Sequence, residues 1–408
     1  MNKTLLILGG NAESIPGIHM AKKMGLHVVV CDKNPVAAGV KFADDHLGND
    51  VLQTDEVLQT IEQYHNKVRP INGVLSFSPY ASLTVARIAE CLTLPGISRA
   101  SAELIADKLA MKTRLRKDKL RLPWYSAVDD ASQLQDIVQS KGFPLLLRPA
   151  KQKKAGGVVY ISKGVDLAWA FNYTKSHALD DAVLVERFIT GQQVSAESLI
   201  LDGDVFTPGF CDRNYEYLKR FSPYVIENGG NLPSLLPDDV QDKINQQIKK
   251  AAHSLGISNG VIKGEFVVHQ LKPYILGVTA GLNGGYIGTH LIPISTGVNV
   301  VQLVIQQALG ETFELKELKP RFTRGVSQRY LFAEPGRIVE ISGVDLARDL
   351  LCIEEVIVKA KVGDVVNSPV DSNSWVVMVI AVGDNRDQAN KHVFDALNHI
   401  TIKTEPLH

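Results

Sequence analysis

Residues 264–285 read GEFVVHQLKPYILGVTAGLNGG and decide the fold of this chain. Two runs rich in β-branched and aromatic residues, 265–268 and 274–279, flank a polar break that contains a proline. This arrangement predicts a β-hairpin. The first strand opens on Glu265, and a carboxylate on one strand with oxygen ligands on its partner can hold Mg²⁺ beside nucleotide phosphates. The second strand carries Gly277 and Thr279 instead of further acids.

The residues before position 106 predict a small parallel sheet. An apolar run at 4–8 ends in Gly9-Gly10, a helical pattern follows, and a second apolar run ends at Asp32, which is typical of a βαβ unit. Asp32 lies 22 residues after Gly10, a spacing that also suits a dinucleotide-binding turn. Further glycines are lacking, because Ala12 and Ser14 stand where the backbone would approach a pyrophosphate. The pattern therefore favours a plain strand-to-helix turn.

The composition excludes several classes of partner. Lys plus Arg equals Asp plus Glu at 44 each, so the 408-residue chain has no net field that would attract nucleic acid or an anionic membrane. The four cysteines are far apart, which argues against a zinc knuckle or a disulfide framework and favours a cytoplasmic location. No stretch approaches the ~20 apolar residues of a membrane helix, and the N-terminus lacks a signal-peptide pattern.

Two basic segments are candidates for phosphate binding. A run between Lys108 and Arg121 carries seven cations, most of which we expect to form the solvated face of a helix. Residues 145–161 predict strand, loop and strand, and the loop holds Lys151, Lys153 and Lys154 before Gly156 and Gly157. Such a loop can fold over a triphosphate with its backbone N–H groups inward. It can equally be an exposed basic turn, and these residues alone do not decide between the two interpretations.

Three segments together resemble the ATP-grasp enzymes. They are the hairpin, residues 143–149 (FPLLLRP) and residues 184–191 (LVERFITG). The most similar branch is that of the carbamoyl-phosphate-synthase-like carboxylate–amine ligases, and residues 311–408 resemble the C-terminal domain of biotin-carboxylase-like members. The implied fold class is α/β. It comprises a doubly wound parallel sheet over 1–106, an α+β ATP-grasp domain of two subdomains over 107–310 with a hinge near 186–189, and an α+β domain over 311–408.

The resemblance also implies roles for individual residues. ATP would be held by Lys108, Arg148, Lys154, Gly156, Gly157, Glu186, Arg187, Phe188, Ile189 and Gln193. Substrate would be held by Asp212, Arg213, Glu227, Asn283 and Gly284, although Asp212 and Arg213 can instead form a surface salt bridge with each other. Arg148 and Asn283 would be catalytic, and Glu265 would hold Mg²⁺.

The chain departs from the family at the second strand of the hairpin. Family members have Glu-x-Asn or Glu-x-Ala there and an Arg two residues on, whereas this chain has Gly277, Thr279 and Gly281. Loss of a bridging carboxylate that supplies about 3–5 kcal/mol would slow phosphoryl transfer by roughly 10² to 10⁴. Asp212, Glu227 and Asn283 are the candidates for a replacement oxygen.

Two functions therefore compete at the sequence level. The first is an ATP- and Mg²⁺-dependent ligase that joins a small acid to an amine through an acyl phosphate. The second is a catalytically degenerate ATP-grasp protein that binds nucleotide or a small ligand as a regulatory or accessory subunit. The persistence of the phosphate-facing residues favours the ligase, and the resemblance also implies a homodimer as a candidate assembly. An NAD-linked oxidoreductase rests only on the incomplete glycine turn.

Overall fold

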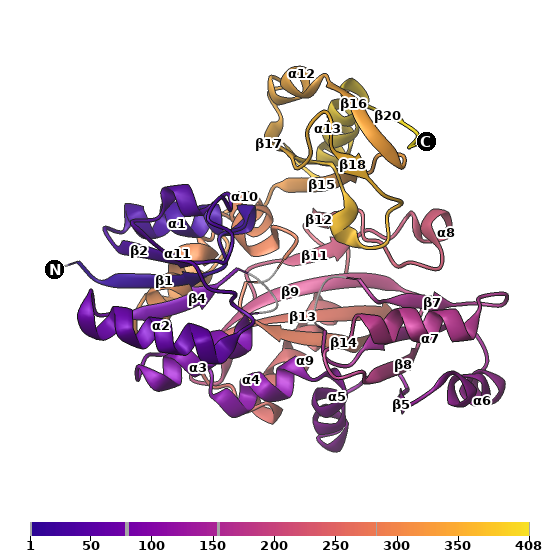
Figure 1. Ribbon diagram of the computed structural model, residues 1–408, viewed down its shortest axis with the longest axis horizontal. Coiled ribbons are helices and arrows are strands. Elements are labelled where there is room, and N and C mark those ends of the chain that lie inside the picture. Colours follow the sequence, from indigo (N-terminus) through magenta and orange to yellow (C-terminus); the bar gives the residue numbers. More distant parts are fainter. Residues whose placement is uncertain (1, 78–80, 153–155, 283, 408) are drawn as a thin grey trace.

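The computed structural model describes residues 2–77, 81–152, 156–282 and 284–407 of the chain (Figure 1). The N-terminal part is a four-stranded parallel sheet in the order β3-β2-β1-β4. Its strands are β1 (Thr4–Leu8), β2 (His27–Cys31), β3 (Asp45–Leu47) and β4 (Gly73–Ser76), and the helices α1 (Ile15–Lys23), α2 (Thr54–Lys67) and α3 (Ser82–Cys91) accompany them. The βαβ prediction is confirmed, and the Asp32 carboxylate accepts the amide of Gly10 at 2.7 Å.

A small antiparallel sheet follows. After α4 (Arg99–Ala106) and α5 (Lys108–Lys117), its strands are β5 (Tyr125–Val128), β6 (Leu145–Pro149), β7 (Val159–Ile161) and β8 (Val183–Arg187), in the order β5-β8-β6-β7. The helices α6 (Ala131–Lys141) and α7 (Leu167–Ser176) pack on it. The predicted strand, loop and strand over 145–161 is confirmed as β6 and β7.

The third part is a nine-stranded sheet that contains the hairpin. Its main path is β14-β13-β9-β11-β12-β15-β19-β17, with β10 paired to β9. The strands are β9 (Gln192–Leu201), β10 (Asp204–Phe206), β11 (Phe210–Arg213), β12 (Gly230–Leu232), β13 (Gly260–His269), β14 (Lys272–Ala280), β15 (Gly325–Leu331), β17 (Ile353–Val358) and β19 (Val377–Gly383). Strands from beyond residue 311 therefore extend the same sheet. One buried core joins the N-terminal sheet to the nine-stranded sheet, including its C-terminal strands β15 and β19, whereas the small sheet has a core of its own.

The remaining elements cover this framework. They are α8 (Leu218–Phe221), α9 (Asp238–Ser254), α10 (Ile292–Thr296), α11 (Val300–Ala308), α12 (Val344–Arg348), α13 (Arg386–His399) and the sheet β18 (Val365–Val366), β16 (Gly336–Ser342), β20 (Thr401–Glu405). Asn385 caps α13 through its side chain, which accepts the amide of Gln388. In the described part of the chain, no helix combines the length and apolarity needed to cross a bilayer.

The register of the hairpin aligns the residues of interest in two rows. Glu265 on β13 lies opposite Gly277 on β14 and Ser195 on β9. Lys263, two residues earlier on β13, lies opposite Thr279 and Glu197. Directly opposed side chains lie on the same face of an antiparallel sheet. The rows Ser195–Glu265–Gly277 and Glu197–Lys263–Thr279 therefore share one face, about 7 Å apart along the strands.

Gly343 offers a direct test of packing in the C-terminal part. Its φ is +78°, and a Cβ there would lie 1.7 Å from the carbonyl oxygen of His399. We expect Gly343→Ala to lower the free energy of unfolding by about 3 kcal/mol or more, measured by chemical denaturation. Gly363→Ala is the matched control, because Gly363 also has a positive φ but faces open space, and it should cost only about 1 kcal/mol. Equal losses in the two variants would show that the contact with His399 is not restrictive.

Candidate active site

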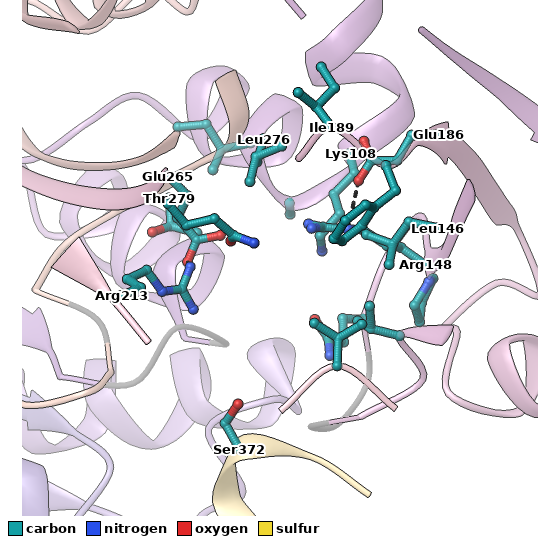
Figure 2. Close-up of a pocket in the computed structure, with 18 of the residues that line it drawn as sticks. Lys108, Leu146, Arg148, Glu186, Ile189, Arg213, Glu265, Leu276, Thr279 and Ser372 are labelled. Atoms are coloured by element: carbon teal, nitrogen blue, oxygen red, sulfur yellow. Dashed lines mark ion pairs between the residues drawn. The ribbon is translucent and has the colours of Figure 1, made fainter. Parts of the chain in front are cut away.

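A cleft of about 340 Å³ separates the small sheet from the hairpin (Figure 2). Lys108, Arg148 and Glu186 lie on one side, and Arg213, Glu265 and Thr279 lie on the other. Ser372, from the C-terminal part, contributes to the lining. The structure thus brings together residues from widely separated parts of the sequence around one cavity.

The wall formed by the small sheet contains a buried charge triad of Glu186, Lys112 and Arg148. The Glu186 carboxylate on β8 lies 2.9 Å from Lys112 Nζ and 2.8 Å from Arg148 Nε. The side chains of Lys112 and Glu186 are 0% and 1% exposed. Burial alone would raise the pKa of Glu186, but the two cations outweigh it and hold the pKa below its ordinary value. The carboxylate is therefore ionised, and its neighbours leave the wall with excess positive charge.

Lys112 corrects a sequence-based expectation. Most cations of 108–121 were expected on a solvated helix face, with Lys108 as the one named exception. Lys112 is a second exception, because α5 turns its side chain into the protein interior. Residues four apart lie on the same helix face, so the spacing of Lys108 and Lys112 is the signal that could have identified it.

Lys108 adds a further cation to this wall. Burial, followed by the charge of Arg148, lowers the pKa of Lys108 to about 8. Among the described residues, the cleft is lined by four basic and two acidic side chains, namely Lys108, Arg148, Arg187, Arg213, Glu186 and Glu265. Such a surplus of positive charge favours an anionic ligand.

The opposite wall holds Glu265 in its ionised form. Glu265 Oε1 lies 3.0 Å from Arg213 Nη1, and Arg213 also pairs with Glu227 through its Nε at 3.0 Å. Burial would raise the pKa of Glu265, but Arg213 and Lys263 outweigh it and lower the pKa to about 2. Glu265 thus faces the cleft as a carboxylate at any physiological pH.

One part of the cleft is suited to a planar apolar group. Leu146, Ile189 and Leu276, all labelled in Figure 2, line it from both walls. Arg187, Phe188 and Gln193 also line the cleft. Their role in holding a nucleoside stays a prediction.

Several predicted residues lie elsewhere. Gly156 and Gly157 lie against His177, Gly284 lines a separate small cavity, and Lys154 and Asn283 fall outside the described residues. The salt bridge between Asp212 and Arg213 is a wrong expectation, because neighbours on a strand point to opposite faces.

Asp212 and Arg213 instead have separate partners. Asp212 pairs with Arg386 and accepts the amide of Leu235 at 3.0 Å, so it lies away from the Glu265 cleft. Glu227 forms an ion pair with Arg213. Neither acid supplies an oxygen to the lining of the cleft.

Comparison with known proteins agrees with this architecture. Residues 18–96 match the family model for the ATP-grasp N-terminal domain, and residues 329–405 match that for the L-amino acid ligase C-terminal domain 2. The solved L-amino acid ligase from Bacillus licheniformis superposes with a TM-score of 0.83 at 20% identity, over 99% of each chain. The chain has an ATP-grasp fold.

Other ATP-grasp structures superpose over similar lengths. Phosphoribosylglycinamide synthetase from Anaerococcus prevotii gives a TM-score of 0.75 at 20% identity, over 99% of this chain and 100% of that one. Carboxyaminoimidazole ribonucleotide synthase from Aspergillus clavatus, complexed with ATP, gives 0.78 at 13% identity over 97% and 98%. An uncharacterized protein, y4rH, of Sinorhizobium fredii is 24% identical over 396 residues, covering 95% of this chain and 80% of the relative.

The described residues contain no group of three or more His, Cys, Asp or Glu placed to hold a metal ion. The Thr279 hydroxyl is shielded from solvent and has no hydrogen-bond partner among those residues, and it faces the same cleft as Glu265. One carboxylate and one hydroxyl fit a single Mg²⁺ that takes its other ligands from phosphates and water.

The buried triad predicts a large effect of Lys112→Met on stability. Removing one partner leaves Glu186 buried with only Arg148, so we expect the free energy of unfolding to fall by about 3–5 kcal/mol in chemical denaturation. Lys117→Met, on the exposed side of the same helix, should change it by less than about 0.5 kcal/mol. A Lys112→Met protein as stable as the wild type would mean that the triad does not hold this wall together.

Proposed function

We propose that the chain is an ATP-dependent ligase that joins a carboxylic acid to an amine. The observation that carries the proposal is the pairing of a cationic wall, Lys108 and Arg148, with the ionised Glu265 across one cleft. Phosphoryl transfer requires positioning and charge neutralisation more than covalent participation of the protein. The cleft offers both, beside an apolar slot that suits an adenine ring.

The proposed reaction has two steps. A carboxylate oxygen of the acid attacks the γ-phosphorus of ATP, the bond to the β,γ-bridging oxygen breaks, and ADP leaves with that electron pair. The amine nitrogen then attacks the acyl carbon, the carbon–oxygen bond to phosphate breaks, and the nitrogen loses a proton to solvent. Arg148 and Lys108 would hold the phosphates, and Arg213 would stabilise charge beside Glu265. A bound Mg²⁺, held by Glu265 and Thr279, would neutralise phosphate charge.

The matched domain and one structural neighbour suggest the substrate class. Residues 329–405 match an L-amino acid ligase domain, and the Bacillus licheniformis neighbour is an L-amino acid ligase. We therefore propose that an amino acid supplies the carboxylate, the amine or both.

A degenerate nucleotide-binding protein is the second candidate. Gly277 and Gly281 favour it, because neither can supply the acid or the guanidinium that the family has there. The φ of Gly281 is +102°, a conformation that an arginine would adopt only under strain. The two candidates differ in turnover. Release of phosphate from ATP that requires both an acid and an amine supports the ligase. Binding of ATP without release of phosphate supports the second candidate.

ATP binding is expected to depend on Lys108. We expect Lys108→Ala to weaken ATP binding about tenfold or more in isothermal titration calorimetry, because it removes one charge-assisted contact with a phosphate. Lys117→Ala keeps the same helix and removes an exposed lysine, so it should bind like the wild type. Equal affinity of all three proteins would place the nucleotide outside this cleft.

Gly277→Glu is expected to restore a second metal ligand. A Cβ at this position would lie 3.7 Å from Glu265 Oε2 and meets no other described atom closer, so the new carboxylate has room. With ATP present, the wild type should bind one Mn²⁺ and the variant two, counted by electron paramagnetic resonance. Gly48→Glu, at an open position of the N-terminal part, is the control and should behave as the wild type. The same count in wild type and Gly277→Glu would contradict the reduced metal site.

A further inference from the structure

A second, much smaller cavity lies beside the row Glu197–Lys263–Thr279. It measures about 10 Å³ and is lined by Glu13, Phe77, Glu197, Leu282, Gly284, Tyr286, Ile287, Gly288 and Thr289. A space of this size holds one water-sized group. None of the lining residues is a lysine, arginine or histidine, and two of them are carboxylic acids.

The two acids reach the cavity from different parts of the fold. Glu13 follows β1 of the N-terminal sheet, and its Oε1 accepts the amide of Gly285 at 2.9 Å. Glu197 comes from β9 in the centre of the large sheet and is 1% exposed. The cavity therefore lies where the N-terminal part meets the sheet of the ATP-grasp cleft.

One oxygen in this cavity lacks a partner. Glu197 Oε2 is buried and makes no hydrogen bond within the described residues. It points toward Gly288, because a Cβ on Gly288 would lie 2.0 Å from it, and Gly288 itself lines the cavity. A buried carboxylate oxygen without a partner is costly, so its position indicates a ligand that donates a hydrogen bond.

The local charge balance specifies the sign of that ligand. Burial acts first and raises the pKa of both acids, that of Glu197 to about 7, while Lys263 lowers the pKa of each and Lys359 also lowers that of Glu13. At Glu197 one lysine, Lys263, acts against burial and against the charge of Glu13, so the surroundings of this carboxylate carry no surplus of positive charge. A single small cation with N–H donors would balance the charge of this carboxylate and satisfy its free oxygen.

We propose that Glu197 and Glu13 bind an ammonium group, either a free ammonium ion or the ammonium end of an amine or amino acid. Where that group belongs to the substrate, the inference rests on the proposed ligase function. In the register of the sheet, Glu197 lies opposite Lys263, which is two residues from Glu265 along β13. The row of Glu197 is therefore roughly 7 Å from the row of Glu265, which faces the proposed phosphates. This places the amine near the position at which an acyl phosphate would form.

The test on the full chain without ATP uses a series of chloride salts at equal ionic strength. Ammonium and methylammonium should raise the melting temperature above that in tetramethylammonium, which has no N–H donor, and in potassium, which matches only the charge. Glu197→Gln, which keeps the shape and removes the charge, should abolish this difference. Glu103→Gln, at an exposed helix position, should retain it. Glu13→Gln provides a second variant if Glu197→Gln does not fold.

The outcomes are distinct from those that test the ligase. Three results would each overturn the site. The wild type could have the same melting temperature in all four salts, potassium could have the same effect as ammonium, or Glu197→Gln could retain the ammonium effect. Because this series contains neither ATP nor an acid substrate, its result does not depend on whether the protein turns over ATP. If phosphate release is found, Glu197→Gln should raise the KM for the amine about tenfold or more, with unchanged affinity for ATP. A response of KM to ammonium chloride but to no amino acid would identify the free ion as the ligand.

Discussion

The nucleotide-sized cleft depends on one buried charge cluster, in which Glu186 is held between Lys112 and Arg148. The three residues come from β8, α5 and β6, so their attraction fixes a helix against two strands of the small sheet. Ions can remain buried only when they are paired and well placed. The surplus of one positive charge in the triad also makes this wall suitable for the anionic ligand proposed above.

The opposite wall of the cleft is built by the strands β11, β13 and β14 of the large sheet. At the second strand of the hairpin, where the resemblance to ATP-grasp enzymes implies acids and an arginine, this chain has Gly277, Thr279 and Gly281. Arg213 reaches Glu265 from β11, and Lys263 stands two residues before Glu265 on β13 itself. Two side-chain cations, Arg213 and Lys263, therefore keep the single carboxylate of this wall ionised.

The sequence predicted the framework better than the site. The hairpin was predictable because its two apolar runs and the break between them are local features, and the βαβ unit of the N-terminal part was predictable for the same reason. Lys112 was missed because a basic run on a helix is normally solvated, and only the tertiary fold shows which face is covered. The opposite directions of Asp212 and Arg213 follow from strand alternation, but their partners Arg386 and Glu227 are distant in sequence. The small acidic cavity depends on the register of β9 with β13, which no local pattern specifies.

The most direct measurement is a crystal structure of the protein with a non-hydrolysable ATP analogue and Mg²⁺. The polyphosphate should lie between Arg148 and Glu265, the adenine ring beside Leu276 and Ile189, and a single Mg²⁺ at Glu265. A nucleotide bound on another surface, with the Arg148–Glu265 cleft empty, would contradict this interpretation of the fold.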